Sequence, residues 1–257
     1  GTGDGLDIES VLIPFEARIT LCVSSQVGCG MACGFCLTGR MKKKRNLSAG
    51  EIVHQVYHVA RAESPERKIS NIVFMGMGEP LDNFDNVVKA VNILKSSSGM
   101  GFAARRITVS TSGIADKIAE LGEKTDVNLA LSFVTPEMEA GARLMPVLKK
   151  FPIGKIISEL KKYPLKKGRR ITIEYIMLKG INDSPDDARR LIRTFADVPV
   201  KINLIPFNRF DGAEFEPPET EKINVFHEFL HKKHFVSVIR QSRGTDIGAA
   251  CGQLDGR

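Results

Sequence analysis

Four of the five cysteines of this 257-residue chain lie within fifteen positions, in the stretch CVSSQVGCGMACGFC from Cys22 to Cys36. Three of them, Cys29, Cys33 and Cys36, form a CxxxCxxC motif. This spacing can bind three irons of a 4Fe-4S cluster and leave the fourth iron without a protein ligand. A structural zinc site is the weaker alternative, because zinc usually takes four protein ligands and no second CxxC follows. The motif therefore predicts a cluster with one open iron.

The odd number of cysteines and their clustering argue against a secreted disulfide framework and favour metal binding or thiol chemistry. The sequence has no run of about 18 apolar residues that would predict a membrane span. It also has no charged-then-apolar leader. We therefore expect a soluble, cytoplasmic protein that has no membrane partner. We also expect it to be a monomer.

The net charge is +7, from 37 basic and 30 acidic residues. Much of the excess lies in two runs, MKKKR at 41–45 and a lysine-rich stretch at 148–170. Such runs are typical either of a solvated surface or of a surface that binds a polyanion. Charge alone is a weak indication of RNA or DNA as a partner.

Elements that could position these residues follow one another in regular alternation. Apolar and β-branched stretches predict strands at 18–25, 71–78, 106–113, 127–134, 170–178 and 201–208, with a further strand at 235–242. Amphipathic patterns predict helices at 48–62, 84–97, 114–124, 152–163, 184–197 and 218–234. Six βα units in sequence imply parallel strands joined by helices. An open sheet and a closed or partial barrel both fit this pattern, without a division into domains.

Polar motifs fall where the predicted strands end. The cysteine loop follows the first strand, and the later strand ends carry GMGEP at 76–80, STSG at 110–113, SFV at 132–134 and PFN at 206–208. In parallel α/β folds, chemistry gathers at the carboxyl ends of the strands. We therefore expect these loops to surround one site. GMGEP is not a Rossmann motif, because Leu81 follows and no third glycine does.

A CxxxCxxC motif after the first strand of an α/β barrel resembles the radical S-adenosylmethionine (SAM) enzymes. Further stretches, from about residue 8 to residue 254, are similar to the RlmN/Cfr family of radical SAM RNA methyltransferases: LCVSSQVGC, FMGMGEPLDN, RRITVSTSG, ITIEYIMLKGINDS, KINLIPFN and RGTDIGAACGQL. The resemblance implies an α/β fold with a partial (β/α)6 TIM-like barrel at 18–242. It also implies an N-terminal extension at 1–17, which ends an accessory domain that this chain lacks, and a C-terminal segment at 243–257.

The activity implied by this resemblance is methylation of carbon 2 of an adenine in 23S rRNA and tRNA, with carbon 8 as the alternative. The family uses two SAM molecules per turnover and an electron donor such as flavodoxin or ferredoxin. The open iron binds the amino and carboxylate groups of SAM, and an electron from the cluster splits SAM into methionine and a 5′-deoxyadenosyl radical. Radical chemistry suits carbon 2, because no ordinary base removes its hydrogen.

The resemblance also assigns catalytic roles. Cys251, in AACGQL, matches the thiol that accepts the methyl group, and the nucleophilicity of a thiolate suits that step. Cys22 matches the thiol that forms a disulfide with Cys251 as the product leaves. Glu9 matches the proton acceptor, a role for which Cys22 competes. The structural alternatives are a buried strand residue for Cys22, a helix-packing residue for Cys251 and a solvent-facing edge-strand residue for Glu9.

SAM binding is assigned in the same way, residue by residue. The matching positions are Gly78, Glu79, Ser110, Ser132, Phe133, Val134 and Asn208. Glu79 can bind the ammonium group of SAM, and Asn208 can hydrogen-bond its polar edges. The family commonly has SLH where this chain has SFV at 132–134, so a hydrogen-bonding histidine is absent here.

Two other classes of protein remain as alternatives. HEFLH at 227–231 is formally the HExxH motif of zinc proteases. Its apolar neighbours, such as Phe226 and Leu230, favour a chance match on an outer barrel helix. His54 and His58 are interpreted as part of a solvated helix face. A non-catalytic RNA-binding relative is the third class, but such a protein would not need all five cysteines.

Overall fold

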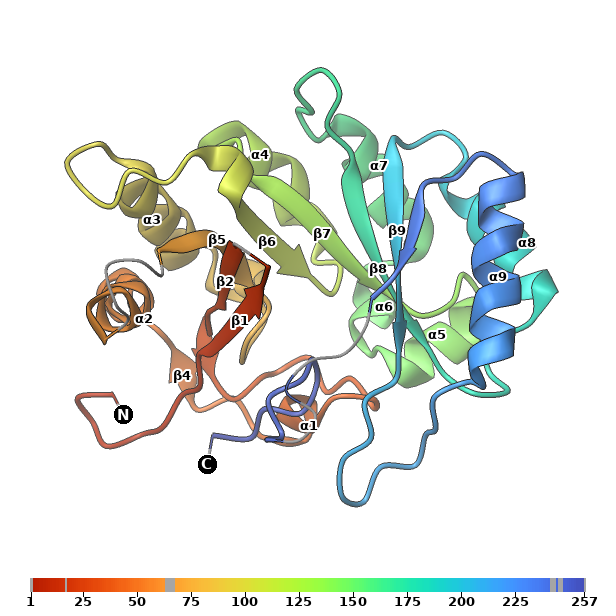
Figure 1. Cartoon of the computed structure of the whole chain (residues 1–257), viewed down its shortest axis with the longest axis horizontal. Coiled ribbons are helices and arrows are strands. Elements are labelled where there is room, and N and C mark those ends of the chain that lie inside the picture. The colour runs from red at the N-terminus through yellow and green to blue at the C-terminus, as the bar shows by residue number, and fades with distance from the viewer. Residues whose placement is uncertain (1, 17, 63–67, 241–243, 245–246, 257) are drawn as a thin grey trace.

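The computed structural model describes residues 2–16, 18–62, 68–240, 244 and 247–256. Its centre is an eight-stranded sheet in the order β1-β2-β5-β6-β7-β8-β9-β10. β1 is antiparallel to β2, and every other neighbouring pair is parallel. The sheet curls and the helices lie along its outer side (Figure 1). The predicted partial barrel is therefore confirmed.

The seven predicted strands are all present in the structure. The strands of the large sheet are β1 (Val11–Phe15), β2 (Arg18–Cys22), β5 (Ile69–Phe74), β6 (Ile107–Thr111), β7 (Asn128–Phe133), β8 (Ile171–Met177), β9 (Val200–Pro206) and β10 (Ser237–Ile239). A separate small sheet pairs β3 (Gln26–Val27) with β4 (Arg45–Asn46). β10 is shorter than predicted, and residues 241–242 of its predicted range lie outside the described residues.

The six predicted helices are also present. The α-helices are α1 (Leu37–Arg40), α2 (Ala49–Ala62), α3 (Phe84–Lys95), α4 (Ile118–Thr125), α5 (Met138–Leu144), α6 (Val147–Lys150), α7 (Ile153–Lys162), α8 (Pro185–Phe195) and α9 (Thr220–Lys232). The short helices α1, α5 and α6 were not predicted. α8 begins where it does because Ser184 and Asp187 form a capping box around Pro185 at its first turn.

β1 lies within the range predicted as an N-terminal extension. It pairs with β2 along its whole length, from Val11 opposite Cys22 to Phe15 opposite Arg18. This part of the extension is therefore an edge strand of the barrel sheet. Residues 1 and 17 of the extension, and residues 243, 245–246 and 257 of the C-terminal segment, lie outside the described residues. The predicted domain boundaries stay predictions.

The core between the sheet and the outer helices fixes the second half of the barrel. Tyr175 of β8 stacks on Phe226 of α9, with ring centroids 5.4 Å apart. Phe133 of β7 meets Phe195 of α8 edge to face at 5.1 Å. The Tyr175 hydroxyl donates to the carbonyl of Asn182 at 2.8 Å, so its polar end is satisfied. These contacts hold the strand ends that border the site in fixed positions.

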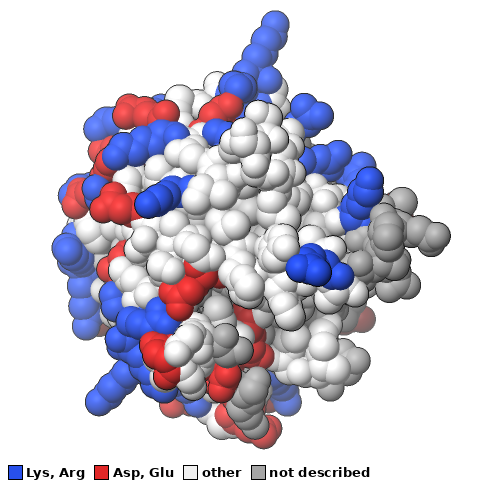
Figure 2. Space-filling model, turned by 90° about the vertical axis from the view of Figure 1, so that its left-hand side faces the viewer, with Lys and Arg blue, Asp and Glu red and all other residues white. Residues whose placement is uncertain are grey.

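Figure 2 shows the side of the molecule that lies on the left in Figure 1, where α2 and α3 are found. Lys and Arg side chains gather along the left and lower left of this view, and its central area carries few charges. Tyr57 of α2 and Ile93 of α3 are among the exposed apolar side chains. None of the helices that the structure describes combines the length and the apolar character needed to cross a membrane.

Candidate active site

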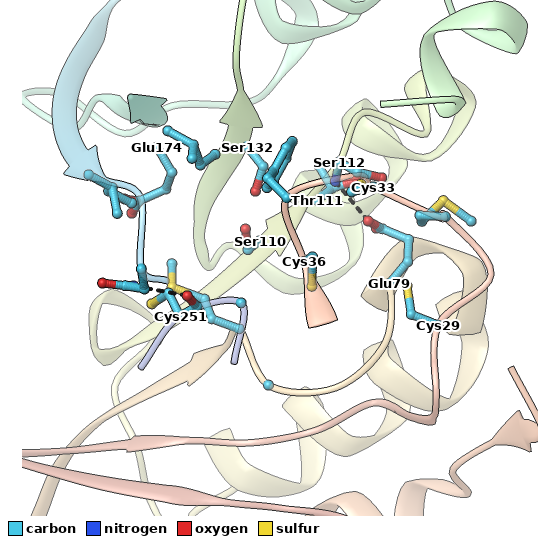
Figure 3. A pocket seen from close by; sticks show the side chains of 18 of the residues that line it. Cys29, Cys33, Cys36, Glu79, Ser110, Thr111, Ser112, Ser132, Glu174 and Cys251 are labelled. Carbon is cyan, nitrogen blue, oxygen red and sulfur yellow. Dashed lines mark hydrogen bonds between the residues drawn. The ribbon is translucent and has the colours of Figure 1, made fainter. Parts of the chain in front are cut away.

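A cavity inside the partial barrel, which we name the inner cavity, is bordered by the strand-end loops (Figure 3). The expectation that these loops surround one site is confirmed. Its lining comprises Cys29, Met31, Cys33, Phe35, Cys36, Phe74, Met75, Gly76, Gly78, Glu79, Pro80, Ser110, Thr111, Ser112, Ser132, Glu174, Ile176, Ile205, Pro206, Phe207, Asn208, Arg240, Cys251 and Gly252.

The three cysteines of the CxxxCxxC motif all border the inner cavity as free thiols. Burial raises the pKa of Cys29 to about 12 and also raises the pKa values of Cys33 and Cys36. Binding to iron would replace these protons. Among the described residues, no three His, Cys, Asp or Glu side chains converge on one metal position. Three thiolate ligands in this spacing suit three irons of a 4Fe-4S cluster, whereas structural zinc usually takes four protein ligands.

The loop that carries Cys29, Cys33 and Cys36, which we name the cluster loop, lies close to the backbone of other segments at both of its ends. Gly28 has a φ of +74°, and a Cβ there would lie 2.5 Å from the carbonyl oxygen of Lys42, so glycine is required. At the other end, the backbone N–H of Leu37 donates to the carbonyl of Gly252 at 2.7 Å. The second contact ties the cluster loop to the C-terminal segment that carries Cys251.

Glu79 is a buried carboxylate whose two oxygens are both held by backbone donors. Oε2 accepts from the N–H of Ser112 at 2.7 Å, and Oε1 accepts from the N–H of Leu81 at 3.0 Å. The N–H of Glu79 itself donates to Oε1 of Gln26 at 2.9 Å. Burial raises the pKa of Glu79, and the backbone donors oppose that rise. The carboxylate is therefore fixed in the cavity wall.

Gly78 allows the GMGEP loop to lie directly on β3. Its φ is +99°, and a Cβ at this position would be 2.5 Å from the Cβ of Gln26. Neither the backbone conformation nor the space accepts a side chain. The close approach places Glu79 beside Gln26 and at the inner cavity.

The remaining residues predicted to bind SAM fall into two groups. Ser110, Ser132 and Asn208 border the inner cavity, but Phe133 and Val134 are not among its lining residues. Phe133 points into the core, and the Val134 side chain is buried. Any contact of these two residues with SAM stays a prediction. Strand alternation explains the difference for Phe133, because successive strand residues point to opposite faces and Ser132 faces the barrel interior, whereas Val134 follows the end of β7.

A second space, which we name the edge cavity, lies between the two edge strands β1 and β10. It is bordered by Cys22 and Cys251, and by Val11, Ile13, Phe15, Thr20, Met75, Ile205, Asn208, Val238, Ile239, Arg240, Ala249, Ala250 and Leu254. Cys251 borders both cavities, whereas Cys22 borders only the edge cavity of these two. The two remaining thiols of the chain thus border one cavity, and their action as a pair stays a prediction.

Desolvation dominates the acidity of both thiols. Burial raises the pKa of Cys22 to about 12, and the neighbouring Cys251 adds to the rise. The pKa of Cys251 is also raised by burial, although its surface is accessible to the cavities that meet there. Arg240 opposes both shifts because its positive charge favours a thiolate. The two thiols are therefore protonated until a substrate or a base changes their surroundings.

Arg240 and Glu174 are site residues that the sequence analysis missed. Nη1 of Arg240 lies 3.7 Å from Oε1 of Glu174, and both residues border the inner cavity. Glu174 also accepts two hydrogen bonds from the Asn203 amide, at 3.1 and 3.2 Å. For Glu174 the available signal was its charge inside the otherwise apolar strand sequence ITIEYIM. A strand that is covered on both faces has no solvent-facing side for a charge.

Asn208 is hydrogen-bonded to the backbone of Cys251. The Asn208 amide donates to the backbone carbonyl of Cys251 at 2.9 Å, which anchors the backbone next to the thiol. Glu9 has a related position, because its Oε2 accepts from the N–H groups of Asp255 and Gly256 at 2.9 and 2.8 Å. Glu9 is not among the described residues that border either cavity.

The HExxH motif does not form a zinc site in the described part of the chain. His227 and His231 lie on α9, and Nε2 of each faces the same carbonyl oxygen of Ser237, at 3.1 and 3.2 Å. A catalytic zinc needs three protein ligands and an open position, and no such group is present among the described residues. The protease alternative is therefore not supported. His54 and His58 stack on each other on α2, with ring centroids 6.1 Å apart.

Comparisons with known proteins agree with this geometry. The radical SAM superfamily matches residues 23–192. The chain is 52% identical over 254 residues to the dual-specificity RNA methyltransferase RlmN of Geotalea uraniireducens, with 99% of this chain and 73% of that protein covered. Identity to RlmN of Geobacter sulfurreducens is 50%, with 99% and 69% covered. A crystal structure of a radical SAM methyltransferase from Sphaerobacter thermophilus is 44% identical with a TM-score of 0.96, and the match covers all of this chain and 76% of that one.

Proposed function

Since the chain belongs to the RlmN family of radical SAM RNA methyltransferases, we propose that it methylates carbon 2 of an adenine in 23S rRNA and tRNA. We further propose that the methyl group travels on Cys251. The observation that carries this proposal is the position of Cys251 in the wall between the inner cavity and the edge cavity. A sulfur that must first meet SAM and then meet a base needs access to two spaces.

The residues around the inner cavity support binding of a cluster and of SAM. Cys29, Cys33 and Cys36 would hold three irons of the cluster, which supplies the electron that cleaves SAM. Glu79 would orient the ammonium group of SAM, because its carboxylate is already fixed by two backbone donors. Ser110 would contribute a polar contact from the adjacent wall.

Cys251 would act first, as the acceptor of a methyl group from one SAM molecule. Its sulfur forms a bond to the methyl carbon, the bond from that carbon to the SAM sulfur breaks, and the thiol proton is released. Arg240 would assist because its charge favours the thiolate form. A second SAM molecule, when bound beside the reduced cluster, would supply a deoxyadenosyl radical that takes a hydrogen from the methyl group on Cys251, so that the methylene carbon on this sulfur could bond to carbon 2 of the adenine. The adduct would then have to lose the carbon-2 proton and one electron, which the oxidised cluster would accept.

Cys22 would act last. Its thiolate attacks the Cys251 sulfur of the RNA adduct, so a disulfide forms and the bond between sulfur and the methylene carbon breaks. The electron pair of that bond stays on the carbon, which takes a proton and becomes the new methyl group. The position of Cys22 supports this order, because it borders the edge cavity but is not among the residues of the inner cavity.

Removal of the ring proton has two candidates, Cys22 and Glu9. Position favours Cys22, since it borders the edge cavity and Glu9 borders neither cavity of the described structure. Glu9 instead holds the backbone that follows Cys251 through its bonds to Asp255 and Gly256. We therefore propose that Glu9 positions the C-terminal segment.

The decisive experiment compares Cys22→Ala with Cys251→Ala, each produced in cells that supply SAM and RNA. Cys22→Ala should retain a nucleotide joined through one carbon to a peptide that contains Cys251, because release is blocked. Cys251→Ala should have neither a methylated cysteine nor an adduct, while both variants keep about four irons per chain. Mass spectrometry after nuclease digestion detects the adduct, and analysis of the modified base distinguishes carbon 2 from carbon 8. An unmodified or merely methylated Cys251 in iron-replete Cys22→Ala would refute the proposal.

A further inference from the structure

A row of side chains from β1 and β2 forms one side of the edge cavity. The strands pair Val11 with Cys22, Ile13 with Thr20 and Phe15 with Arg18. Residues directly opposite each other in antiparallel strands point to the same face, so these six form a single row, which we name the edge row. All of them except Arg18 border the edge cavity. The edge row therefore runs from the Cys22 thiol at one end to Phe15 and Arg18 at the other.

Two apolar side chains that border the edge cavity are exposed to solvent. Phe15 of β1 is 53% exposed, and Val238 of β10 is 55% exposed. We name this pair the cavity mouth. Edge strands usually carry charged residues or proline, because apolar edges invite contacts with other molecules. An exposed apolar pair on two edge strands of one cavity therefore favours a contact with a ligand.

The charged groups that belong to the edge row and to the edge cavity are positive. Arg240 is the single charged residue among the described residues that border the cavity. Arg18 lies opposite Phe15 and is exposed. Glu16, in the turn between them, is also exposed but does not border the cavity. A ligand with both an apolar face and a negative charge fits these surroundings, and a nucleotide has both.

The edge row is too long for a single base. Cys22 and Arg18 are four residues apart on β2, which corresponds to about 14 Å at about 3.4 Å per residue. A purine is narrower than this distance, so an adenine at the thiols leaves Phe15 uncovered. Enzymes that act on a base move it out of its stack, and the neighbouring base then has an uncovered face. An aromatic side chain can cover that face whatever the base is.

We propose that Phe15 stacks on the base next to the target adenine and that Arg18 binds a phosphate beside this base. Val238 contacts the same base from β10. This proposal rests on the function proposed above and adds a second nucleotide site to it, at which no bond forms or breaks. The site requires the RNA around the adenine to be single-stranded, because a paired neighbour could not turn its face to Phe15.

The first test measures how tightly the anaerobically prepared holoprotein binds RNA hairpins with an adenine in a single-stranded loop. In two further hairpins, the nucleotide before or after the adenine lacks its base. Wild type should bind one of these abasic hairpins about tenfold more weakly than the intact hairpin, because the stacked base is missing. Phe15→Ala should bind the intact hairpin about tenfold more weakly than wild type does. It should bind that abasic hairpin no more weakly than the intact one, because the two changes remove the same contact.

Three further variants separate stacking from a structural effect. Phe15→Leu keeps an apolar residue in the strand but has no ring, so it should lose affinity as Phe15→Ala does. Phe15→Tyr keeps the ring and should bind as wild type does. Tyr57→Ala is the matched control, because it removes an exposed aromatic ring from α2. This control should leave the affinity for every hairpin unchanged.

The second test examines the phosphate contact. Arg18→Gln should reduce the slope of log affinity against log salt concentration by about 0.7, the contribution of one phosphate on a single strand. Its control is Arg193→Gln, at an exposed position on α8. The control should keep the wild-type slope, and an unchanged slope for Arg18→Gln would remove Arg18 from the proposed site.

Equal binding of all three hairpins by wild type would overturn the proposal, and this result does not depend on the folding of any variant. A tenfold loss on removal of the base that persists in Phe15→Ala would also overturn it. A second copy of this chain is the other possible occupant of the cavity mouth. A changed sedimentation of Phe15→Ala with unchanged RNA binding would assign the mouth to that copy. If wild type neither bound the intact hairpin nor methylated its adenine, the proposed function itself would fail.

Discussion

Replacement of Gly78 by alanine should damage SAM binding through steric and backbone strain that can be worked out from the structure. The φ of +99° at this position lies where side chains are disfavoured by about 1–2 kcal/mol. A Cβ would also lie 2.5 Å from the Cβ of Gln26 and 2.8 Å from its backbone nitrogen, whereas carbon atoms normally meet at about 3.5–4.0 Å. Overpacking of this kind costs about 1–3 kcal/mol. The expected destabilisation is therefore about 2–5 kcal/mol.

This strain would be transmitted to the cavity wall, because Gln26 accepts the hydrogen bond from the N–H of Glu79. If the GMGEP loop of the variant moves and relieves about 1.4 kcal/mol of the strain, SAM binding has to restore that strain. SAM affinity then falls about tenfold. Calorimetric titration of the iron-replete protein with SAM measures that loss. Thermal unfolding measures the stability change, at about 2–4 °C per kcal/mol for a chain of this size.

Gly168→Ala is the matched control. Gly168 also has a positive φ, +81°, but no described atom lies within 4 Å of an added Cβ. It should therefore show only the backbone cost of about 1–2 kcal/mol and keep its affinity for SAM. Suppose that Gly78→Ala bound SAM as tightly as wild type and unfolded at the same temperature as Gly168→Ala. The close approach of Gly78 to Gln26 would then not constrain the site.

Two further predictions concern the buried ionisable groups. Burial raises the pKa of Cys22 from 9.0 to about 12, so its stabilising effect is present below pH 9 and is lost as the pH rises towards 12. Between pH 8 and 10, the unfolding free energy of wild type should therefore fall by about 1.4 kcal/mol more than that of Cys22→Ala. Denaturant titrations under anaerobic conditions measure this difference. If the unfolding free energy of both proteins fell equally with pH, the result would contradict the buried thiol. Arg240→Met should destabilise the fold by about 1–3 kcal/mol, because Glu174 loses the cation at 3.7 Å, with the partial exposure of Arg240 reducing the effect. Adding Glu174→Gln should restore most of that stability, and no recovery would show that the pair is not coupled.

The regular part of the fold could be predicted from the sequence because long elements repeat their pattern many times. α8, for example, combines an amphipathic pattern with a capping box and a proline in its first turn. α1, α5 and α6 span only four to seven residues, too few for a helical period to be visible. β1 was missed as a strand of the barrel because its antiparallel pairing with β2 is a tertiary contact that its own residues do not reveal.

Part of the cavity lining was predictable: the cysteine loop from residue types in a fixed spacing, and Glu79 from the match to the family. The direction in which side chains point was harder to predict from the sequence. The match to the family assigned SAM contacts to Phe133 and Val134, but the alternation along β7 directs Ser132 into the barrel and Phe133 into the core. Arg240 was missed because it follows a short edge strand, where a charged residue normally indicates exposure to solvent.

The way in which the C-terminal segment is anchored explains how one sulfur can serve two cavities. The backbone around Cys251 is held by Asn208 at its own carbonyl, and by Leu37 at the carbonyl of the next residue. Thr38 donates to the carbonyl of Leu254 at 2.5 Å, so two residues of α1 bind this segment. Such anchoring fixes the backbone of Cys251 in the wall between the cavities, and the proposed function needs this precision because the methyl group would meet a radical on one side and a base on the other. In the proposed function Cys22 resolves the adduct, and its place at the edge cavity would let it approach the Cys251 sulfur from that side.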